Sequence, residues 1–263
     1  MMKANYHTHT VRCKHAQGSE REYVEAAIAN GIEILGFSDH APYSFDDDYA
    51  THIRMDFSEL EEYVDTLQRL KKEYEKDIQI HIGLEMEYFP KFFDETYEKL
   101  KEYPLEYLIL AAHFYGNGYC KVGKQAFVKP TGMAEHFHDY YEQLCEGMKK
   151  GCFTYLAHPD LLNFTGDVEI LKAKMRMLCK EANKYQLPVE INLHGSVTNK
   201  HYPNEIFWKI AGEEQCRVIV GIDAHDVTEF QYQKHYEKAM ELVKKYQLNL
   251  LETVEIKGIN PRF

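Results

Sequence analysis

Short apolar runs alternate with longer amphipathic stretches along the whole sequence, and this alternation constrains the fold more than any other feature. Most of the short runs are continuous and rich in β-branched residues, which is typical of strands buried on both faces. The seven predicted strands are residues 4–9, 34–39, 78–86, 107–113, 153–158, 188–193 and 217–223. Such strands belong to a mostly parallel sheet that helices cover, which is the α/β class.

The stretches between the strands carry apolar residues at helical spacing. In the stretch 58–74, for example, Leu60, Tyr63, Val64 and Leu67 fall on one face. Helices are predicted at 19–29, 58–74, 134–148, 169–185, 204–213 and 231–246, with a weaker pattern at 92–101. Seven strand–helix units in 263 residues favour a βα barrel over an open doubly wound sheet. No linker-like segment interrupts the pattern, so a single domain of residues 1–263 is expected.

Polar side chains that can bind metal ions follow the predicted strands at the points where these end. Because all strands of a βα barrel end on the same face, where its active sites lie, these side chains are expected to converge. The set comprises His7, His9, His15, His40, Glu85, His113, His158, Asn192, His194, Asp223 and His225. A single histidine at a strand end is more often a satisfied polar residue than a ligand. Seven such strand ends in one chain instead predict a metal centre, because burying unpaired polar groups is costly.

Two pairs of these residues, His7 with His9 and Asp223 with His225, are separated by one residue. Residues i and i+2 of a strand point to the same side, so both members of a pair can reach one centre. A carboxylate such as Glu85 can bridge two ions, whereas a neutral imidazole offers one lone pair to one ion. Imidazole and carboxylate ligands suit Mn²⁺, Fe²⁺ or Zn²⁺.

Charge and composition argue against several partners and compartments. The net charge of −11 disfavours binding to nucleic acid or to an anionic membrane. No stretch approaches the roughly 20 apolar residues of a membrane span, and the N-terminus lacks a signal-peptide pattern, so a cytoplasmic protein is expected. Six cysteines occur without a CxxC pair and are interpreted as reduced thiols, although Cys13 lies close enough to the candidate ligands to leave a redox or soft-metal role open. The sequence does not predict the oligomeric state.

Taken together, the motifs at the strand ends resemble those of the PHP superfamily (polymerase and histidinol phosphatase) over nearly the whole chain. The motifs that carry the resemblance are His7-Thr8-His9, Ser38-Asp39-His40, Gly83-Leu84-Glu85, His113-Phe114, Ala157-His158-Pro159-Asp160 and Asp223-Ala224-His225. Within the superfamily, the segments His52-Ile53-Arg54-Met55 and Gly83-Leu84-Glu85-Met86-Glu87-Tyr88 resemble the histidinol-phosphatase branch.

The resemblance implies a distorted (β/α)7 barrel that holds up to three divalent ions, Mn²⁺, Fe²⁺ or Zn²⁺. Carried over by position, the ligands of the first ion would be His7, His9, Glu85 and Asp223. Those of the second ion would be Glu85, His113 and His158, and those of the third would be His15, His40 and His225.

The same branch implies a metal-dependent phosphomonoesterase that hydrolyses L-histidinol phosphate to L-histidinol and phosphate. Two ions bridged by Glu85 would lower the pKa of a shared water towards roughly 7, which gives an attacking hydroxide. Asp223 is predicted to combine the roles of ligand and proton acceptor, and His194 is a candidate acid. The predicted substrate contacts are the cations Arg54 and Lys200 and the pocket tyrosines Tyr43 and Tyr115.

The identity of the substrate stays open, because the chain departs from the branch in two places. The branch commonly has an arginine soon after Glu-Ile-Asn, whereas Lys200 is the first cation after Asn192 here, and residues 115–119 also differ. The alternative is a phosphoesterase or phosphodiesterase acting on another small phosphorylated metabolite. A nuclease of the same barrel is disfavoured by the acidic charge and the lack of a basic, aromatic-rich groove. A non-catalytic metal-binding or regulatory protein is disfavoured because a structural zinc site needs only about four ligands.

Overall fold

A single parallel sheet organises the chain, which the computed structural model describes over residues 1–45, 52–114 and 126–259. Eight strands follow one another in sequence order, and every neighbouring pair is parallel. The strands are β1 (Ala4–Asn5), β2 (Ile34–His40), β3 (Gln79–Glu87), β4 (Tyr107–Ala111), β5 (Tyr155–Leu156), β6 (Val189–Asn192), β7 (Arg217–Gly221) and β8 (Asn249–Leu250). The seven strands that the sequence predicts are therefore confirmed, and a two-residue eighth strand is added.

The sheet curls until the segment after β1 meets the segment after β7. Thr8 and Ala224 form a parallel bridge there, and the His9 amide donates to the Ala224 carbonyl at 2.9 Å. Strand β8 pairs instead with Arg217 and Val218 at the start of β7. The first seven strands thus come together at their carboxyl ends, while the eighth lies beside the beginning of β7. This geometry is a distorted barrel, as predicted.

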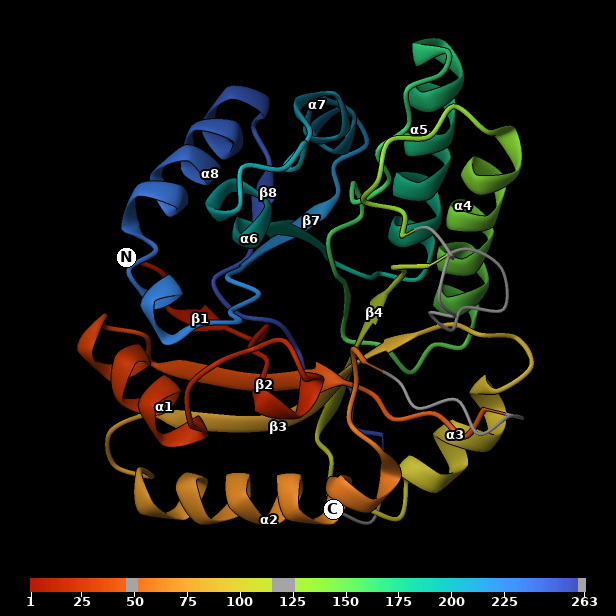
Figure 1. The fold of residues 1–263 in the computed structure, drawn as a ribbon. Helices are drawn as coiled ribbons and strands as arrows, with labels where there is room; N and C mark the ends of the chain where they lie inside the picture. Colours follow the sequence, from red (N-terminus) through yellow and green to blue (C-terminus); the bar gives the residue numbers. More distant parts are fainter. Residues whose placement is uncertain (46–51, 115–125, 260–263) are drawn as a thin grey trace.

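Helices surround the strands on the outside, and their observed bounds lie within two residues of the predicted ones (Figure 1). They are α1 (Glu20–Ala29), α2 (Phe57–Glu73), α3 (Phe93–Leu100), α4 (Ala134–Lys149), α5 (Val168–Lys184), α7 (Glu205–Glu213) and α8 (Gln233–Tyr246). Polar caps define several starts: Ser19 and Glu22 form a capping box at α1, and the Asp167 carboxylate accepts from two amides of α5. None of the helices in the described segments is long and apolar enough to cross a membrane.

One short helix departs from the prediction. The sequence continues the sixth strand to residue 193, but the structure ends β6 at Asn192 and begins α6 (Leu193–Val197) there. As a result, His194 projects from a helix rather than from a strand end.

A layer of aromatic side chains fills part of the barrel and forms a separate cluster from the core beneath the helices. Alternate residues of β4, including Tyr107, contribute to this cluster, as period-two geometry requires. The Tyr107 hydroxyl donates to the Tyr6 and Phe37 carbonyls at 2.7 and 3.0 Å. A β-carbon at Gly83 would lie 2.4 Å from the Tyr107 ring, which is too close for any side chain. The glycine two residues before Glu85 therefore leaves room for the tyrosine.

Asp160 ties the loop after β5 to helix α7. Its carboxylate accepts hydrogen bonds from the Asn204 amide and, at 3.1 Å, from the indole N–H of Trp208. Burial raises the pKa of Asp160 to about 7, so the folded chain holds this proton more tightly than the unfolded chain does. The stability that protonated Asp160 provides is complete below the unfolded pKa of about 4 and is lost as the pH rises through 7.

The substitution Asp160→Asn should therefore remove this pH dependence. Between pH 5 and pH 8 the free energy of unfolding of the variant, relative to the parent chain, should rise by about 2 kcal/mol. Urea unfolding of both proteins at the two pH values measures this difference. An unchanged difference between the proteins would show that Asp160 titrates normally.

Candidate metal centre

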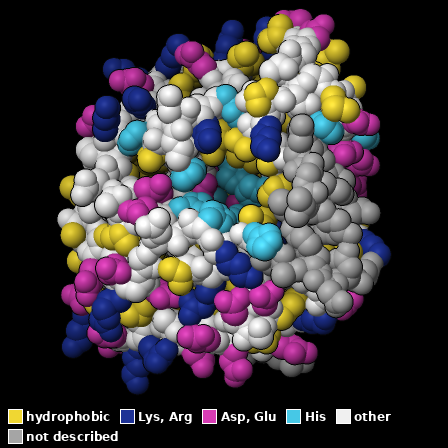
Figure 2. Space-filling model, in the orientation of Figure 1, with side chains coloured by type: hydrophobic (Ala, Val, Ile, Leu, Met, Phe, Trp, Pro, Cys, Tyr) yellow, Lys and Arg dark blue, Asp and Glu magenta, His cyan; other side chains and the backbone are white. Residues whose placement is uncertain are grey.

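The Glu85 carboxylate, at the end of β3, lies at the centre of a group of histidine rings. Ring nitrogens of five histidines lie 2.7–3.6 Å from its two oxygens: His40, His158, His7, His113 and His9. Glu85 itself is 2% exposed. Figure 2 shows histidine side chains gathered in a hollow on this face of the molecule. The convergence that the sequence predicts is therefore present.

A second carboxylate, that of Asp223, faces the same rings from the end of β7. Its Oδ1 atom is 3.1 Å from His9 Nε2, 3.3 Å from His7 Nε2 and 3.6 Å from His225 Nδ1. His7 and His9 thus turn the same nitrogen towards both Glu85 and Asp223. This is the arrangement expected from the His-x-His spacing.

Several atoms of this cluster are buried and have no hydrogen-bond partner among the described residues. They are His7 Nε2, both ring nitrogens of His9, Glu85 Oε2 and Asp223 Oδ1. Unpaired buried polar atoms are rare in folded proteins because each costs free energy. Nitrogen lone pairs and carboxylate oxygens that face one another in a buried space fit a divalent cation.

The donor atoms form overlapping sets, in each of which all atoms lie within 4.8 Å of one another. Three of the sets are His7–His9–Glu85, His40–Glu85–His113 and His15–His40–His225. The third equals the predicted third ligand set, and the first is part of the predicted first set. His40 belongs to two sets, so it can serve an ion on either side of Glu85.

Hydrogen bonds outside the cluster fix the tautomers of several rings. His7 Nδ1 lies 2.8 Å from the Glu190 carboxylate, while His15 Nδ1 and His225 Nδ1 donate to the Cys13 and Asp223 carbonyls at 2.7 and 3.0 Å. An acceptor at Nδ1 requires the proton there, which leaves the Nε2 lone pair for a metal ion.

Glu190 supports the cluster from β6 although it does not belong to any predicted ligand set. Besides His7, it accepts from the His158 amide at 3.1 Å and from the Asn192 side chain at 3.0 Å. A β-carbon at Gly221 would lie 1.9 Å from the Glu190 carboxylate, so this glycine of β7 makes the space that Glu190 occupies.

The isosteric substitution Glu190→Gln should lower divalent-metal affinity by roughly 10–100-fold, as is typical when the partner of a ligating histidine is lost. Both Glu190 oxygens accept hydrogen bonds, from four donors in all, whereas a glutamine has one acceptor oxygen, so its amide group must face a donor. Chelator competition measures the change. Glu169→Gln on the exposed start of α5 is the matched control, and equal affinities in both variants would contradict the role of Glu190.

Electrostatics of the cluster favour bound cations. Burial alone would raise the pKa values of Glu85 and Asp223, but the surrounding histidines hold both well below their usual values, so both are anions. Burial also lowers the pKa values of His40 and His225, which leaves these rings neutral. For His7, the effect of burial is outweighed by Asp223 and its neighbouring carboxylates, which raise the pKa. A metal ion at His7 therefore competes with a proton, and its affinity falls with falling pH.

Two residues of the cluster hold the backbone in the left-handed region. His158 has a φ of 27° and Asp223 a φ of 58°. Residues other than glycine adopt positive φ at a cost, and such strain is concentrated at functional sites. The backbone thus aims both side chains at the cluster.

The hollow has a volume of about 420 Å³. It is lined by His15, His40, Ile53, Glu85, His113, Phe114, Ala126, Val128, His158, Leu161, His194, Lys200, Tyr202, Asp223 and His225. Lys200 is the only lysine or arginine in this lining as far as the described residues show. His194 also lines the hollow, and its Nδ1 lies 3.4 Å from the Glu229 carboxylate. The position of Lys200 is therefore compatible with its predicted role as a phosphate-binding cation, and that of His194 with its predicted role as an acid.

Two predicted substrate contacts do not line the hollow. The Arg54 guanidinium is buried, donates to the Glu87 carboxylate at 2.6 Å and lies over the Tyr43 ring. The Tyr43 hydroxyl donates to the Glu87 carbonyl. Arg54 and Tyr43 therefore neutralise and pack around Glu87, and the assignment of substrate contact to them is corrected. Tyr115, the remaining predicted contact, lies outside the described residues.

Glu190 and Tyr202 were not predicted as site residues, and Asp39 was named only as part of the Ser38-Asp39-His40 motif, without a role. Asp39 accepts hydrogen bonds from Thr10 and from the His40 amide, which joins the ends of two strands. Glu190 could have been found, because it lies two residues before Asn192 on the same side of a predicted strand. Tyr202 lines the hollow from the loop between α6 and α7, and no spacing in the sequence indicates this position.

The protein is thus a parallel βα barrel. Histidines and carboxylates gather at the carboxyl ends of its strands and form the ligand set of a candidate multinuclear metal centre. Residues 5–194 match the family model of the PHP domain, and the chain belongs to the PHP domain family.

Relatives with known names agree with this assignment. A probable histidinol-phosphatase from Deinococcus radiodurans is 26% identical over 232 residues, which cover 83% of this chain and 85% of the relative. The histidinol-phosphatase of Bacillus subtilis is 37% identical over 122 residues, 43% of this chain and 45% of the relative, so that alignment spans less than half of its length. Histidinol phosphate phosphatase from Lactococcus lactis, complexed with zinc, L-histidinol and phosphate, has a TM-score of 0.74 at 20% identity and covers 97% of this chain and 99% of its own. That likeness shows a shared fold.

Proposed function

We propose that residues 1–263 act as one PHP-type metallohydrolase domain, a phosphomonoesterase that hydrolyses L-histidinol phosphate to L-histidinol and phosphate. The observation that carries the proposal is the Glu85 carboxylate within 3.6 Å of five histidine rings, at the floor of a hollow that Lys200 enters. The names of the sequence relatives support the choice of substrate. Mn²⁺, Fe²⁺ and Zn²⁺ all suit the donor set, in up to three positions, and the cytoplasm is the proposed compartment.

The proposed ligands are the nine residues predicted from the sequence: His7, His9, His15, His40, Glu85, His113, His158, Asp223 and His225. Bound ions would supply Lewis acidity, which activates water and offsets the charge of the phosphate oxygens. The chain contributes orientation and proton transfer. Asp223 Oδ1, which has no described hydrogen-bond partner, would accept the proton of the attacking water.

His194 is the proposed donor of a proton to the leaving alcohol. Its ring lines the hollow but belongs to none of the proposed ligand sets. Burial would lower its pKa, but the Glu229 and Asp223 carboxylates outweigh this effect and raise the pKa above its usual value. A histidine with a raised pKa holds its proton more tightly than a free histidine does, which suits a proton donor to the leaving oxygen.

A second candidate function is hydrolysis of another small phosphate ester. Apolar side chains, among them Ile53, Phe114 and Leu161, line the hollow. In the described part of that lining, the only acidic residues are Glu85 and Asp223, both proposed ligands, so no carboxylate there is left for the ammonium group of histidinol. This composition favours a less polar leaving group.

The test uses metal-loaded enzyme of measured metal content, and compares phosphate release from L-histidinol phosphate with 4-nitrophenol release from 4-nitrophenyl phosphate and from bis(4-nitrophenyl) phosphate. We expect kcat/KM for L-histidinol phosphate to exceed that of the other two by about 10-fold or more, which is the discrimination that contacts with an apolar pocket provide. Preference for the aryl monoester or for the diester would support the second candidate, and hydrolysis of none of the three would overturn both.

Lys200→Ala should raise KM by about 10-fold and change kcat by no more than about 2-fold, because a cation that binds ground-state phosphate contributes uniform binding. Steady-state kinetics with the best substrate measures both constants. Lys180→Ala, on the exposed face of α5, is the control. If KM stays the same, the phosphate is held without Lys200.

A further inference from the structure

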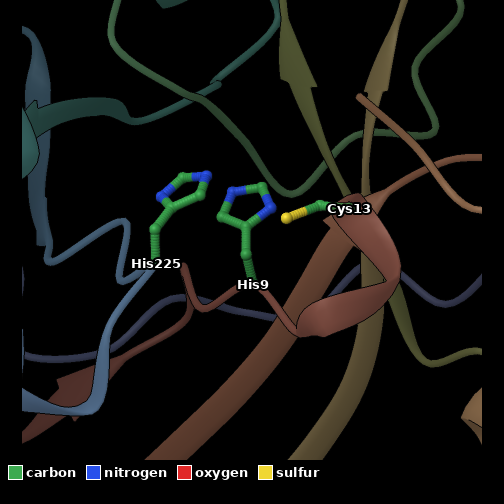
Figure 3. Close-up of side chains that lie close together, drawn as sticks. All are labelled: His9, Cys13 and His225. Atoms are coloured by element: carbon green, nitrogen blue, oxygen red, sulfur yellow. The ribbon is translucent and has the colours of Figure 1, made fainter. Parts of the chain in front are cut away.

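Cys13 lies at the edge of the histidine cluster and has no role in the proposed reaction. It ends the short 3-10 turn Val11–Cys13 that follows β1, and it is fully buried and not disulfide-bonded. One donor atom from each of His9, Cys13 and His225 lies within 4.8 Å of the other two. Figure 3 shows the Cys13 sulfur pointing towards the His9 ring, while His225 approaches from the loop after β7.

His9 provides a second, independent sign of a ligand at this place. Its ring is fully buried, and neither of its nitrogens has a hydrogen-bond partner within the described segments. Asp39 lies 3.6 Å from His9 Nδ1, too far for a normal hydrogen bond. His9 Nδ1 thus lacks a hydrogen-bond partner, as does His9 Nε2, which faces Glu85.

The rings around Cys13 are packed closely. The His9 and His225 rings stack with centroids 4.1 Å apart, and His15 stacks on His225 at 4.7 Å. The three rings therefore crowd together beside Cys13, and one ring nitrogen each of His9 and His225 lies within 4.8 Å of its sulfur. Nitrogen and sulfur ligands in a set of four are the typical surroundings of Zn²⁺.

We propose that Cys13 supplies a sulfur ligand to a divalent ion held between His9 and His225, which gives this edge of the centre a preference for Zn²⁺ over Mn²⁺. Binding exchanges the S–H bond of Cys13 for a sulfur–metal bond and releases that proton to solvent, and no electron is transferred. A neutral His9 has one lone pair, so when it binds this ion it does not bind the ion beside Glu85. Thiolate is a soft ligand that selects zinc and cobalt, whereas the Glu85 side of the cluster offers harder oxygen donors. The inference rests on the metal centre of the proposed function but not on its substrate.

Spectroscopy of the metal-loaded enzyme tests the inference without reference to turnover. Enzyme loaded with Co²⁺ in place of its native ions should show a near-ultraviolet sulfur-to-cobalt charge-transfer band. The band should vanish in Cys13→Ser and persist in Cys152→Ser, where a half-buried cysteine of another region is changed. By chelator competition, Cys13→Ser should lower zinc affinity by about 10-fold or more and leave manganese affinity within about 2-fold.

X-ray absorption at the zinc edge of the unmodified, zinc-loaded enzyme gives a readout that does not depend on folding of a variant. A sulfur scatterer at about 2.3 Å supports the inference. A first shell of nitrogen and oxygen alone, or a cobalt band that persists in Cys13→Ser, overturns it. Phosphate release is measured on the same zinc-loaded sample, so an inactive enzyme with a zinc–sulfur shell would contradict the proposed function and leave the Cys13 ligand standing.

Discussion

Glu85→Gln is expected to lower kcat/KM for phosphate release by at least about 10⁴-fold and to leave the purified enzyme depleted of metal. The glutamine keeps the size of the side chain but removes the charge that faces five histidine rings. An amide oxygen is a weak ligand and cannot bridge two cations as a carboxylate does. Steady-state kinetics and elemental analysis of the same preparation measure the two effects.

Glu106→Gln is the matched control for this loss. Glu106 precedes β4, at the opposite end of the barrel, where it pairs with Lys71 and with His81, each at 2.7 Å. Its substitution removes the same charge from a partly buried carboxylate, and activity should stay within about 2-fold of the parent. Retention of metal and of more than about a tenth of the activity in Glu85→Gln would show that Glu85 is not the centre of the site.

The fold could be predicted because each strand and helix has its own period in the sequence. Buried strands give continuous apolar runs, and the helices between them give stripes at helical spacing, so their bounds follow from local pattern. Strand β8 was not predicted, because its two residues, Asn249 and Leu250, begin only three residues after the end of α8 and do not form a separate apolar run. Residue 193 was placed in a strand because its apolar side chain continues the run of β6, whereas the structure turns there into α6.

The convergence of the candidate ligands could be predicted from residue type at the strand ends. Local pattern, however, does not distinguish between residues on the same side of a strand. Glu85 and Glu87 point to one side of β3, and both are buried. The difference arises from distant partners: Arg54 and the His113 amide bind Glu87, whereas histidine rings surround Glu85. The same distant contact explains why Arg54 was mistaken for a phosphate ligand. The local sequence around Arg54 does not show that its partner will be a buried carboxylate on β3.

Asp223→Asn should lower kcat/KM by about 10³-fold or more and remove at least one metal ion. Asparagine is the closest test of the charge, because it also tolerates the left-handed backbone at φ 58° that Asp223 adopts. The backbone contacts of β1 with β7, including the Asp223 amide to the His7 carbonyl at 3.0 Å, can therefore remain. The loss then reflects the carboxylate, which faces His7, His9 and His225 and accepts from Asn192 at 3.0 Å.

Asp226→Asn, three residues further along, supplies the control for Asp223→Asn. The Asp226 side chain caps a short 3-10 helix by accepting from Thr228, and asparagine can cap in the same way, so activity and metal content should stay within about 2-fold. Circular dichroism and elemental analysis of both variants separate loss of fold from loss of metal. If Asp223→Asn keeps its full metal content but turns over more slowly, Asp223 acts in proton transfer alone. Loss of a metal ligand would weaken metal binding, whether or not that ligand also transfers a proton. Full metal content with full turnover would remove Asp223 from the site.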